Sequence, residues 1–353
     1  MLNKLQKIRA LLTDDSAALF YTEIARKYLT GFSSSLGYLF VTGSKAVLFV
    51  DGRYYEAATK KVDSVVEVEL FNNIAEQSEH LLDGKVKRLL VETSVSVSTL
   101  KSFEKIFKIT VEPSVELEKA VLNMRSVKDD AEIECIIKAQ RIAEKAFEHI
   151  LGFIKPGVSE NQIAAELEYK MKLLGSSEPS FKTIAITGAK TSMPHGEPDD
   201  TIVKKGDFVT MDFGAVWNGY HSDMTRTVAV GFATDKMKNI YDTVLKANIA
   251  AIKKVKACVT AAEVDLAARD IIAAAGFEKE FSHSTGHGVG LEIHEAPTVS
   301  FKNENQLKEN QIITIEPGIY LSGEFGVRIE DMAVVTKNGC NNLTKAKKTL
   351  IIL

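Results

Sequence analysis

Short apolar runs alternate with longer amphipathic segments in the first third of the chain. The apolar runs are rich in Val, Leu, Phe and other strand-favouring residues, and the segments between them have helical spacing. We predict strands at residues 17–21, 38–43, 46–50, 65–70, 88–92 and 109–112. We predict helices near residues 23–30, 53–61, 74–83 and 98–107. This alternation is typical of a layered α/β unit.

The pattern changes over residues 113–130, where Pro113 interrupts the alternation and long helices begin to dominate. Ser126–Asp129 offers a helix start that resembles a capping box. Two further capping boxes, Ser159–Gln162 and Thr260–Glu263, each begin another helix, and a glycine follows the apolar stripe in both cases. We therefore expect the second part of the chain to combine long helices with separate strand-rich stretches.

The order of elements repeats within the second part. A pair of helices followed by a hairpin occupies residues 126–230, and the same order recurs over residues 235–335 without sequence identity between them. We predict two domains, residues 1–122 and 123–353, and assign the chain to the α+β class.

Composition and charge exclude several classes of protein. The net charge of −3 over 353 residues favours neither nucleic acid nor an anionic membrane as a partner. No apolar run reaches the roughly 18 residues that a membrane span needs, and Lys4, Lys7 and Arg9 interrupt any signal-peptide core. The three cysteines are widely spaced and form no CxxC pair, as expected of free thiols in a reducing cytosol. We therefore expect a cytoplasmic protein.

Residues 209–230 are predicted to form a hairpin whose turn is the Asn-Gly pair at 218–219. With that turn, Asp212 faces Thr225 and lies diagonal to Asp223, whereas a turn one residue earlier places the two aspartates directly opposite. Either register puts both aspartates on one face of the sheet. The flanking apolar runs indicate a core sheet, where unpaired carboxylates repel and need a positive partner.

A second acidic pair lies in the strand runs at residues 312–321 and 325–335. Glu316 and Glu330 interrupt these otherwise apolar runs at equal distances from Gly323, so a hairpin brings them together. Glutamates on exposed strand faces are common, and one such hairpin is weak evidence. Two acidic hairpins with a histidine-rich segment between them form a much more specific pattern.

The segment HSTGHGVGLEIHE begins at His283 and includes His287, four residues further on. This is the spacing of a helical metal pair, but each interior glycine costs a helix about 1 kcal/mol. The HExxH order of zinc proteases is also absent. We therefore interpret His287 as the one nitrogen ligand of a metal centre dominated by carboxylates.

Two aspartates, two glutamates and one histidine form an oxygen-rich donor set. Four carboxylates balance the charge of two divalent ions, which in such pairs activate water and polarise a carbonyl. The hardness of the ligands favours Mn(II), Co(II) or Fe(II) and allows Zn(II), and Mn(II) is our first expectation.

These motifs resemble those of the pita-bread metallopeptidases, family M24, in the branch of Xaa-Pro aminopeptidases and Xaa-Pro dipeptidases (prolidases). The stretches that match in order and spacing are residues 193–198, 211–227, 283–297, 314–320 and 326–331. Residues 28–41 and 48–58 look like the creatinase-type N-terminal domain of this branch. The resemblance implies a C-terminal pita-bread domain with a curved antiparallel sheet and flanking helices, preceded by a smaller α/β domain.

The resemblance also implies a role for each acidic residue and for one histidine. Asp212 would bind one ion, and Asp223 and Glu330 would bridge the two ions. His287 and Glu316 would hold the other ion, and Glu316 would serve as the general base as well.

Five further residues fall where this branch lines its substrate site. His195 and His294 would donate hydrogen bonds to the peptide and to the tetrahedral intermediate, and so take part in catalysis. His283, Arg328 and Tyr320 would complete the substrate-binding set. The structural alternative is that Arg328 pairs with an acid such as Asp331 and that Tyr320 only fills space.

The resemblance implies hydrolysis of the bond between an N-terminal residue and a proline in the second position. Our first interpretation is an Xaa-Pro aminopeptidase, and the alternative is an Xaa-Pro dipeptidase, because the sequence does not decide between them. Creatinase, which works without metals, and a catalytically inactive binding module share the fold, but the five intact ligand positions argue against both. The family also implies a homodimer.

Overall fold

The computed structural model describes residues 2–353, which form two compact units, one up to Arg125 and one from Ser126 onward. The boundary predicted between residues 122 and 123 falls inside helix α6 (Val115–Ser126). None of the helices formed by residues 2–353 combines the length and apolar character of a membrane span.

The first unit is a six-stranded mixed sheet with helices packed against it. The strands follow the order β4-β3-β2-β1-β5-β6, in which β1 is antiparallel to β2 and parallel to β5. The strands are β1 (Ser16–Phe20), β2 (Tyr38–Val41), β3 (Ala46–Val50), β4 (Glu67–Leu70), β5 (Arg88–Val91) and β6 (Thr110–Pro113). The helices are α1 (Leu2–Arg9), α2 (Glu23–Thr30), α3 (Tyr55–Lys61), α4 (Ile74–Leu82) and α5 (Val97–Phe107). The predicted strands and helices of this unit are all present, and α1 is additional.

Helix α6 corrects the prediction for residues 113–130, where we expected an interruption. Pro113 ends β6, and Ser114 Oγ then accepts a hydrogen bond from the backbone N–H of Leu117, as an N-cap does. The next helix, α7 (Asp130–Ile150), is capped by Asp129 and not by Ser126. The expected start was therefore wrong by three residues, because Ser126 belongs to the preceding helix.

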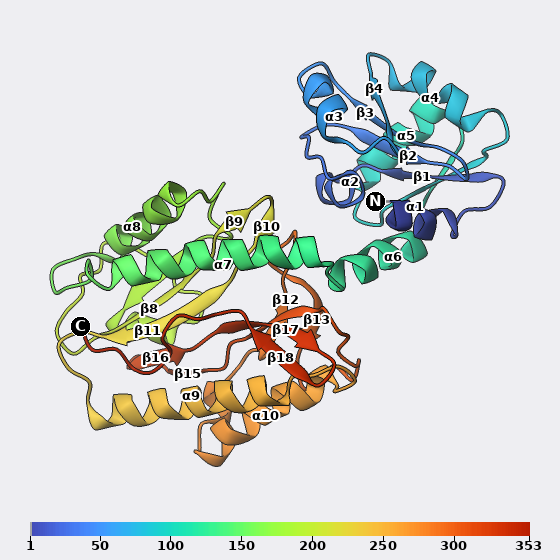
Figure 1. Cartoon of the computed structure of the whole chain (residues 1–353). Helices are drawn as coiled ribbons and strands as arrows, with labels where there is room; N and C mark the ends of the chain where they lie inside the picture. Colours follow the sequence, from blue (N-terminus) through green and yellow to red (C-terminus); the bar gives the residue numbers. More distant parts are fainter. Residues whose placement is uncertain (1) are drawn as a thin grey trace. The chain divides into compact units, whose positions relative to one another are not determined.

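In the second unit, two pairs of helices lie on opposite sides of the strands (Figure 1). The helices are α7, α8 (Glu160–Leu173), α9 (Asp235–Lys254) and α10 (Ala261–Ala274). The strands are β7 (Ile184–Thr187), β8 (Phe208–Phe213), β9 (Val216–Trp217), β10 (Tyr220–His221), β11 (Met224–Ala229), β12 (Gly286–Gly288), β13 (Glu295–Val299), β14 (Ile312–Ile315), β15 (Gly318–Leu321), β16 (Phe325–Arg328), β17 (Asp331–Thr336) and β18 (Gly339–Asn342). The capping boxes predicted for α8 and α10 are confirmed.

Each helix pair has its own apolar core. Helices α7 and α8 pack on β8 and β11 through residues such as Ile163, Met211 and Val228. Helices α9 and α10 pack on β14 to β17 through residues such as Val244 and Ile313. The second unit therefore consists of two halves, each a helix pair with a hairpin, as the repeated order of elements predicts.

The register of the first hairpin settles which of the two predicted turns is used. Trp217 is paired with Tyr220, so the turn is the Asn-Gly pair at 218–219, and Asp212 faces Thr225. Both central residues of this turn have positive φ, 52° and 79°, which Asn and Gly tolerate better than other residues. The hairpin thus places Asp212 and Asp223 on one face.

The second hairpin keeps one register throughout but is interrupted in the middle. Ile315 is paired with Asp331 and Gly318 with Arg328, and the turn contains Gly323. Glu316 and Glu330 lie between these pairs, opposite each other, where the strands briefly separate.

Candidate metal centre

The two hairpins and one short strand bring five potential ligands to one place. Asp212 lies on β8 and Asp223 directly precedes β11, while Glu316 and Glu330 occupy the interruption of the second hairpin. His287 lies on β12, which is a strand, so the four-residue spacing from His283 is not a helical pair.

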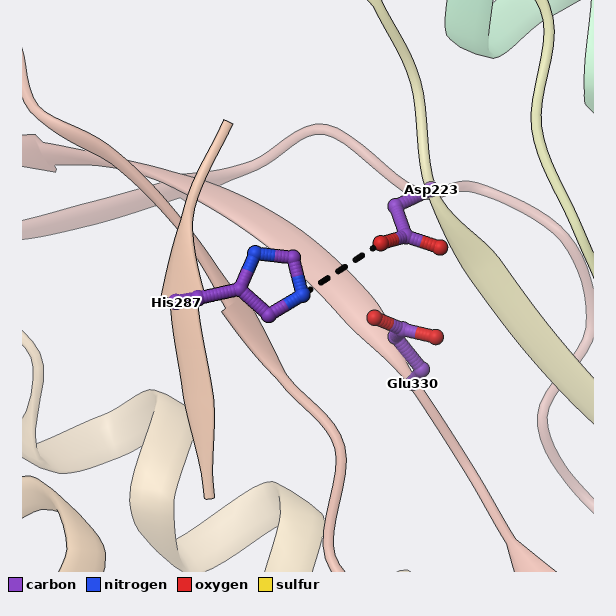
Figure 2. Close-up of side chains that lie close together, drawn as sticks. All are labelled: Asp223, His287 and Glu330. Carbon is purple, nitrogen blue, oxygen red and sulfur yellow. Dashed lines mark ion pairs between the residues drawn. The ribbon is translucent and has the colours of Figure 1, made fainter. Parts of the chain in front are cut away.

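The distances between these side chains are short (Figure 2). His287 Nε2 lies 3.5 Å from Asp223 Oδ2 and 3.4 Å from Glu316 Oε1. Asp223, His287 and Glu330 each offer one ligand atom, and these three atoms lie within 4.8 Å of one another. Figure 2 shows the imidazole of His287 directed at the carboxylates of Asp223 and Glu330.

The tautomer of His287 follows from its hydrogen bonds. Nδ1 lies 3.0 Å from the carbonyl oxygen of Gly288, and because a carbonyl only accepts, Nδ1 carries the proton. Burial lowers the pKa of His287 to about 4, so the ring is neutral at pH 7. Nε2 is then a bare lone pair that faces carboxylates, an arrangement that is repulsive unless a cation lies between them.

The pKa values of the carboxylates reflect their crowding in a buried site. Burial, together with the charges of neighbouring acids, raises the pKa of Asp223 and of Glu330 well above the ordinary range. Burial also raises the pKa of Glu316 to about 8, against the opposing effect of Arg328. These acids are therefore costly to ionise by themselves, and a divalent cation removes that cost.

Two carboxylate oxygens of the site have no hydrogen-bond partner within residues 2–353. Asp212 Oδ1 and Glu330 Oε1 are buried and unpaired, although buried polar atoms are ordinarily satisfied. Four carboxylates, two of them with an unpaired oxygen, and one bare imidazole nitrogen are the donor set that hard divalent ions prefer. The residues present therefore fit a divalent metal centre.

Arg328 connects the carboxylates to the predicted substrate-binding residues. It donates to Asp212 Oδ2 over 2.7 Å and to the Tyr320 hydroxyl over 3.0 Å. The Tyr320 hydroxyl lies 2.9 Å from Nε2 of His283, whose Nδ1 donates to the carbonyl of Ser284. Arg328 thus pairs with an acid, as the alternative interpretation expected, but the acid is Asp212 and not Asp331. Tyr320 does more than fill space, because its hydroxyl links Arg328 to His283.

The remaining two predicted histidines lie at the accessible side of the cluster. His294 is exposed, and its ring centroid is 4.4 Å from that of His287. His195 is also exposed and directly follows Pro194, whose carbonyl accepts a hydrogen bond from Arg328 Nη1 over 3.2 Å. Their positions leave both imidazoles available to a ligand that approaches the carboxylates.

Two threonines that orient the cluster were not singled out as site residues from the sequence. Thr225 Oγ1 donates to Glu330 Oε2 over 2.7 Å and accepts from Arg328 Nε. Thr314 Oγ1 donates to Glu316 Oε1 and accepts from the backbone N–H of His287. Each threonine is two positions from an acid in its own segment, and this two-residue spacing along a strand is the signal that could have found them.

Comparison with known proteins agrees with this geometry. The model of metallopeptidase family M24 matches residues 134–337, and that of the creatinase/prolidase N-terminal domain matches residues 4–127. An Xaa-Pro dipeptidase of Pyrococcus horikoshii is 41% identical over 325 residues, which cover 92% of this chain and 91% of that protein.

Solved structures with the same architecture cover the chain almost completely. An Xaa-Pro dipeptidase from Bacillus anthracis superposes with a TM-score of 0.95 at 37% identity, covering 100% of this chain and 99% of that one. An X-Pro aminopeptidase from Thermotoga maritima superposes with a TM-score of 0.92 at 35% identity, covering 98% and 99%. The predicted fold class, a creatinase-type domain followed by a pita-bread domain, is confirmed. The chain belongs to metallopeptidase family M24, whose members use divalent metal ions for hydrolysis.

Proposed function

We propose that the protein is an exopeptidase that hydrolyses the bond between an N-terminal residue and a proline in the second position. The observation that carries the proposal is the convergence of four acids and a bare imidazole nitrogen in one buried cluster with unpaired oxygens. The specificity for proline is supported by the names of relatives that match nearly the whole chain, a dipeptidase and an aminopeptidase.

We propose the metal ligands that the family resemblance implies, with two ions per chain and Mn(II) as the first expectation. Asp212, Asp223, His287, Glu316 and Glu330 would together hold the ions. When bound, such a pair supplies a water that is acidic enough to react near neutral pH and polarises the scissile carbonyl.

The chain's own residues move the protons and hold the peptide. Glu316 accepts a proton from the attacking water and passes it to the leaving nitrogen, a role open to a carboxylate that bound metal keeps ionised. His195 and His294 donate hydrogen bonds to the peptide and to the oxyanion that forms. Arg328, Tyr320 and His283 are joined by hydrogen bonds and complete the proposed substrate-binding set.

A proline bond calls for a dedicated site because its nitrogen has no hydrogen and its ring fixes φ. We propose an aminopeptidase first. We keep a dipeptidase as the alternative, because solved structures with both names superpose over nearly the whole chain. We further propose residues 123–353 as the catalytic domain, residues 1–122 as the creatinase-like domain, a homodimeric assembly and a cytoplasmic location.

The products of three substrates separate the alternatives. Ala-Pro, Ala-Pro-Ala and a longer Xaa-Pro peptide are incubated with the Mn(II)-loaded protein, and the products are identified by mass spectrometry. Removal of one residue from all three indicates an aminopeptidase, whereas cleavage of Ala-Pro alone indicates a dipeptidase. Cleavage of none of them contradicts the proposal.

The metal ligands are tested with Asp223→Ala. Loss of this carboxylate is expected to abolish measurable hydrolysis of an Xaa-Pro peptide in Mn(II) and to reduce the metal content of the purified protein. Asp235→Ala is the matched control, because Asp235 is 97% exposed at the start of α9. Wild-type turnover by Asp223→Ala would refute the assignment.

A further inference from the structure

Helix α10 carries a buried ion pair that belongs to no part of the metal cluster. Asp265 and Arg269 are four residues apart and form a bidentate pair, with Nε–Oδ2 and Nη2–Oδ1 distances of 2.8 and 3.1 Å. The Asp265 side chain is completely buried, and that of Arg269 is 16% exposed. A buried ion pair gains little net stability, because desolvation offsets the attraction.

The pair binds the backbone of the histidine segment. Asp265 Oδ1 accepts from both the N–H and the hydroxyl of Thr285, over 3.0 and 2.8 Å. Arg269 donates to the carbonyls of Phe281 and His283, over 3.0 and 2.8 Å. The guanidinium also lies over the Phe281 ring, 4.2 Å from its centroid. Both charged groups thus engage residues 281–285 from one side.

Residues 281–285 have no regular secondary structure, so the helix supplies partners that a strand would otherwise provide. The segment in turn contacts the proposed site at two points. The Thr285 carbonyl accepts a hydrogen bond from the N–H of Glu316 over 2.7 Å. His283 Nε2 lies 2.9 Å from the Tyr320 hydroxyl.

We propose that Asp265 and Arg269 are positioning residues that fix the backbone of residues 281–285 and so set the placement of Glu316 and His283. This inference rests on the proposed function. The pair acts through the backbone and touches neither substrate nor metal. Its contribution is geometric: a shift of the Thr285 carbonyl displaces the Glu316 backbone, and small displacements of a catalytic group cost large factors in rate.

The test compares Arg269→Met with the milder Arg269→Lys in the full-length protein. Lysine keeps the charge but loses the planar fork that holds Asp265 and two carbonyls at once. We expect kcat on an Xaa-Pro peptide to fall by about 10–100-fold in Arg269→Met, the range typical of outer residues that orient metal ligands, and by less in Arg269→Lys. KM should change far less than kcat.

A second readout does not depend on turnover. Co(II) is loaded in place of Mn(II), and its visible absorption, which reports ligand geometry, is compared between variants. We expect altered bands in Arg269→Met and in Asp265→Asn. If the wild type binds Co(II) but cleaves no Xaa-Pro peptide, the proposed function fails while the spectra still decide the role of the pair.

Two controls separate positioning from loss of stability. Ile272→Ala truncates a side chain on the buried core side of the same helix and lowers Tm by an amount comparable to the loss of a buried ion pair, without touching the pair. Lys254→Met removes an exposed ion pair to Glu263 of α10, with side chains 42% and 45% exposed. Both controls should keep wild-type kcat and Co(II) spectra.

The outcomes that overturn the proposal are definite. Wild-type kcat and Co(II) bands in Arg269→Met would refute it. An equal fall in kcat in Ile272→Ala at a comparable loss of Tm would also refute it. Where Arg269→Met does not fold, Arg269→Lys and Asp265→Asn carry the same comparison.

Discussion

Removal of the metal should make the stability of the second unit strongly dependent on pH. The cause is Glu316, whose pKa burial raises from 4.5 to about 8 in the metal-free site. Between these values the unfolded chain has released the proton and the folded chain still holds it. The folded state therefore binds more protons, and its stability falls as pH rises through this window.

The size of the effect follows from the width of the window. At about 1.4 kcal/mol for each pH unit, the full interval corresponds to roughly 5 kcal/mol. Below about pH 6.5 the lowered pKa values of His283 and His287 act in the opposite direction, because the folded rings stay neutral while the unfolded ones take up protons. The test window is therefore pH 6.5 to pH 8, where Glu316 alone corresponds to about 2 kcal/mol and water that enters the metal-free site reduces the expected loss to about 1–2 kcal/mol. The pKa values of Asp223 and Glu330 are raised in the same direction and steepen the slope.

Urea unfolding at pH 6.5, 7, 7.5 and 8 measures this loss. The single tryptophan, Trp217, lies at the turn of the first hairpin and reports on the second unit alone. Protein dialysed against a chelator is compared with protein in saturating Mn(II), where the acids are held ionised and bound metal adds stability. Glu316→Gln, which cannot ionise, is expected to show a much shallower slope when metal-free.

The reasoning makes a definite prediction of sign. Metal-free stability that is flat or rises from pH 6.5 to pH 8 would refute it. The same slope in Glu316→Gln and in the wild type would show that the loss arises elsewhere.

Two further substitutions test how the site is supported. A Cβ at Gly286 would lie 1.9 Å from the Thr314 carbonyl oxygen, so Gly286→Ala should separate β12 from β14. We expect this variant to bind Mn(II) about 10-fold more weakly, or worse, in calorimetric titration. Gly339→Ala is the control, because its Cβ meets nothing within 4 Å, and it should bind Mn(II) as the wild type does. Lys190 pairs with the fully buried Glu160, so Lys190→Met should lower the free energy of unfolding by about 3 kcal/mol in urea titration. A loss below about 0.5 kcal/mol would contradict that reading.

The parts of the site that depend on local geometry could be predicted from the sequence. Glu316 and Glu330 are equidistant from Gly323, and hairpin pairing is set by counting from the turn, so their juxtaposition follows from spacing alone. The same holds for Asp212 and Asp223 once the Asn-Gly turn is placed.

Contacts between distant segments could not be predicted in this way. Arg328 and its partner Asp212 are 116 residues apart, and nothing in the spacing selects that acid over Asp331. The hydrogen bond from the Thr285 N–H to Asp265 likewise depends on how α10 packs beside residues 281–285. Helix α6 was missed for a different reason, because a single serine after Pro113 begins the helix where a break was the simpler interpretation.

The two halves of the second unit each have a separate core, and each delivers two of the four acids. An ion bound to carboxylates of both halves would therefore cross-link two hairpins that also share apolar contacts, because Phe208 and Ala229 of the first hairpin pack in the core of the second half. Without it, the carboxylates meet in one buried cluster, where burial and neighbouring acids raise the pKa values of Asp223, Glu316 and Glu330. The proposed metal site therefore serves both the chemistry and the contact between the hairpins, and we expect metal loss to weaken that contact before it disturbs either apolar core.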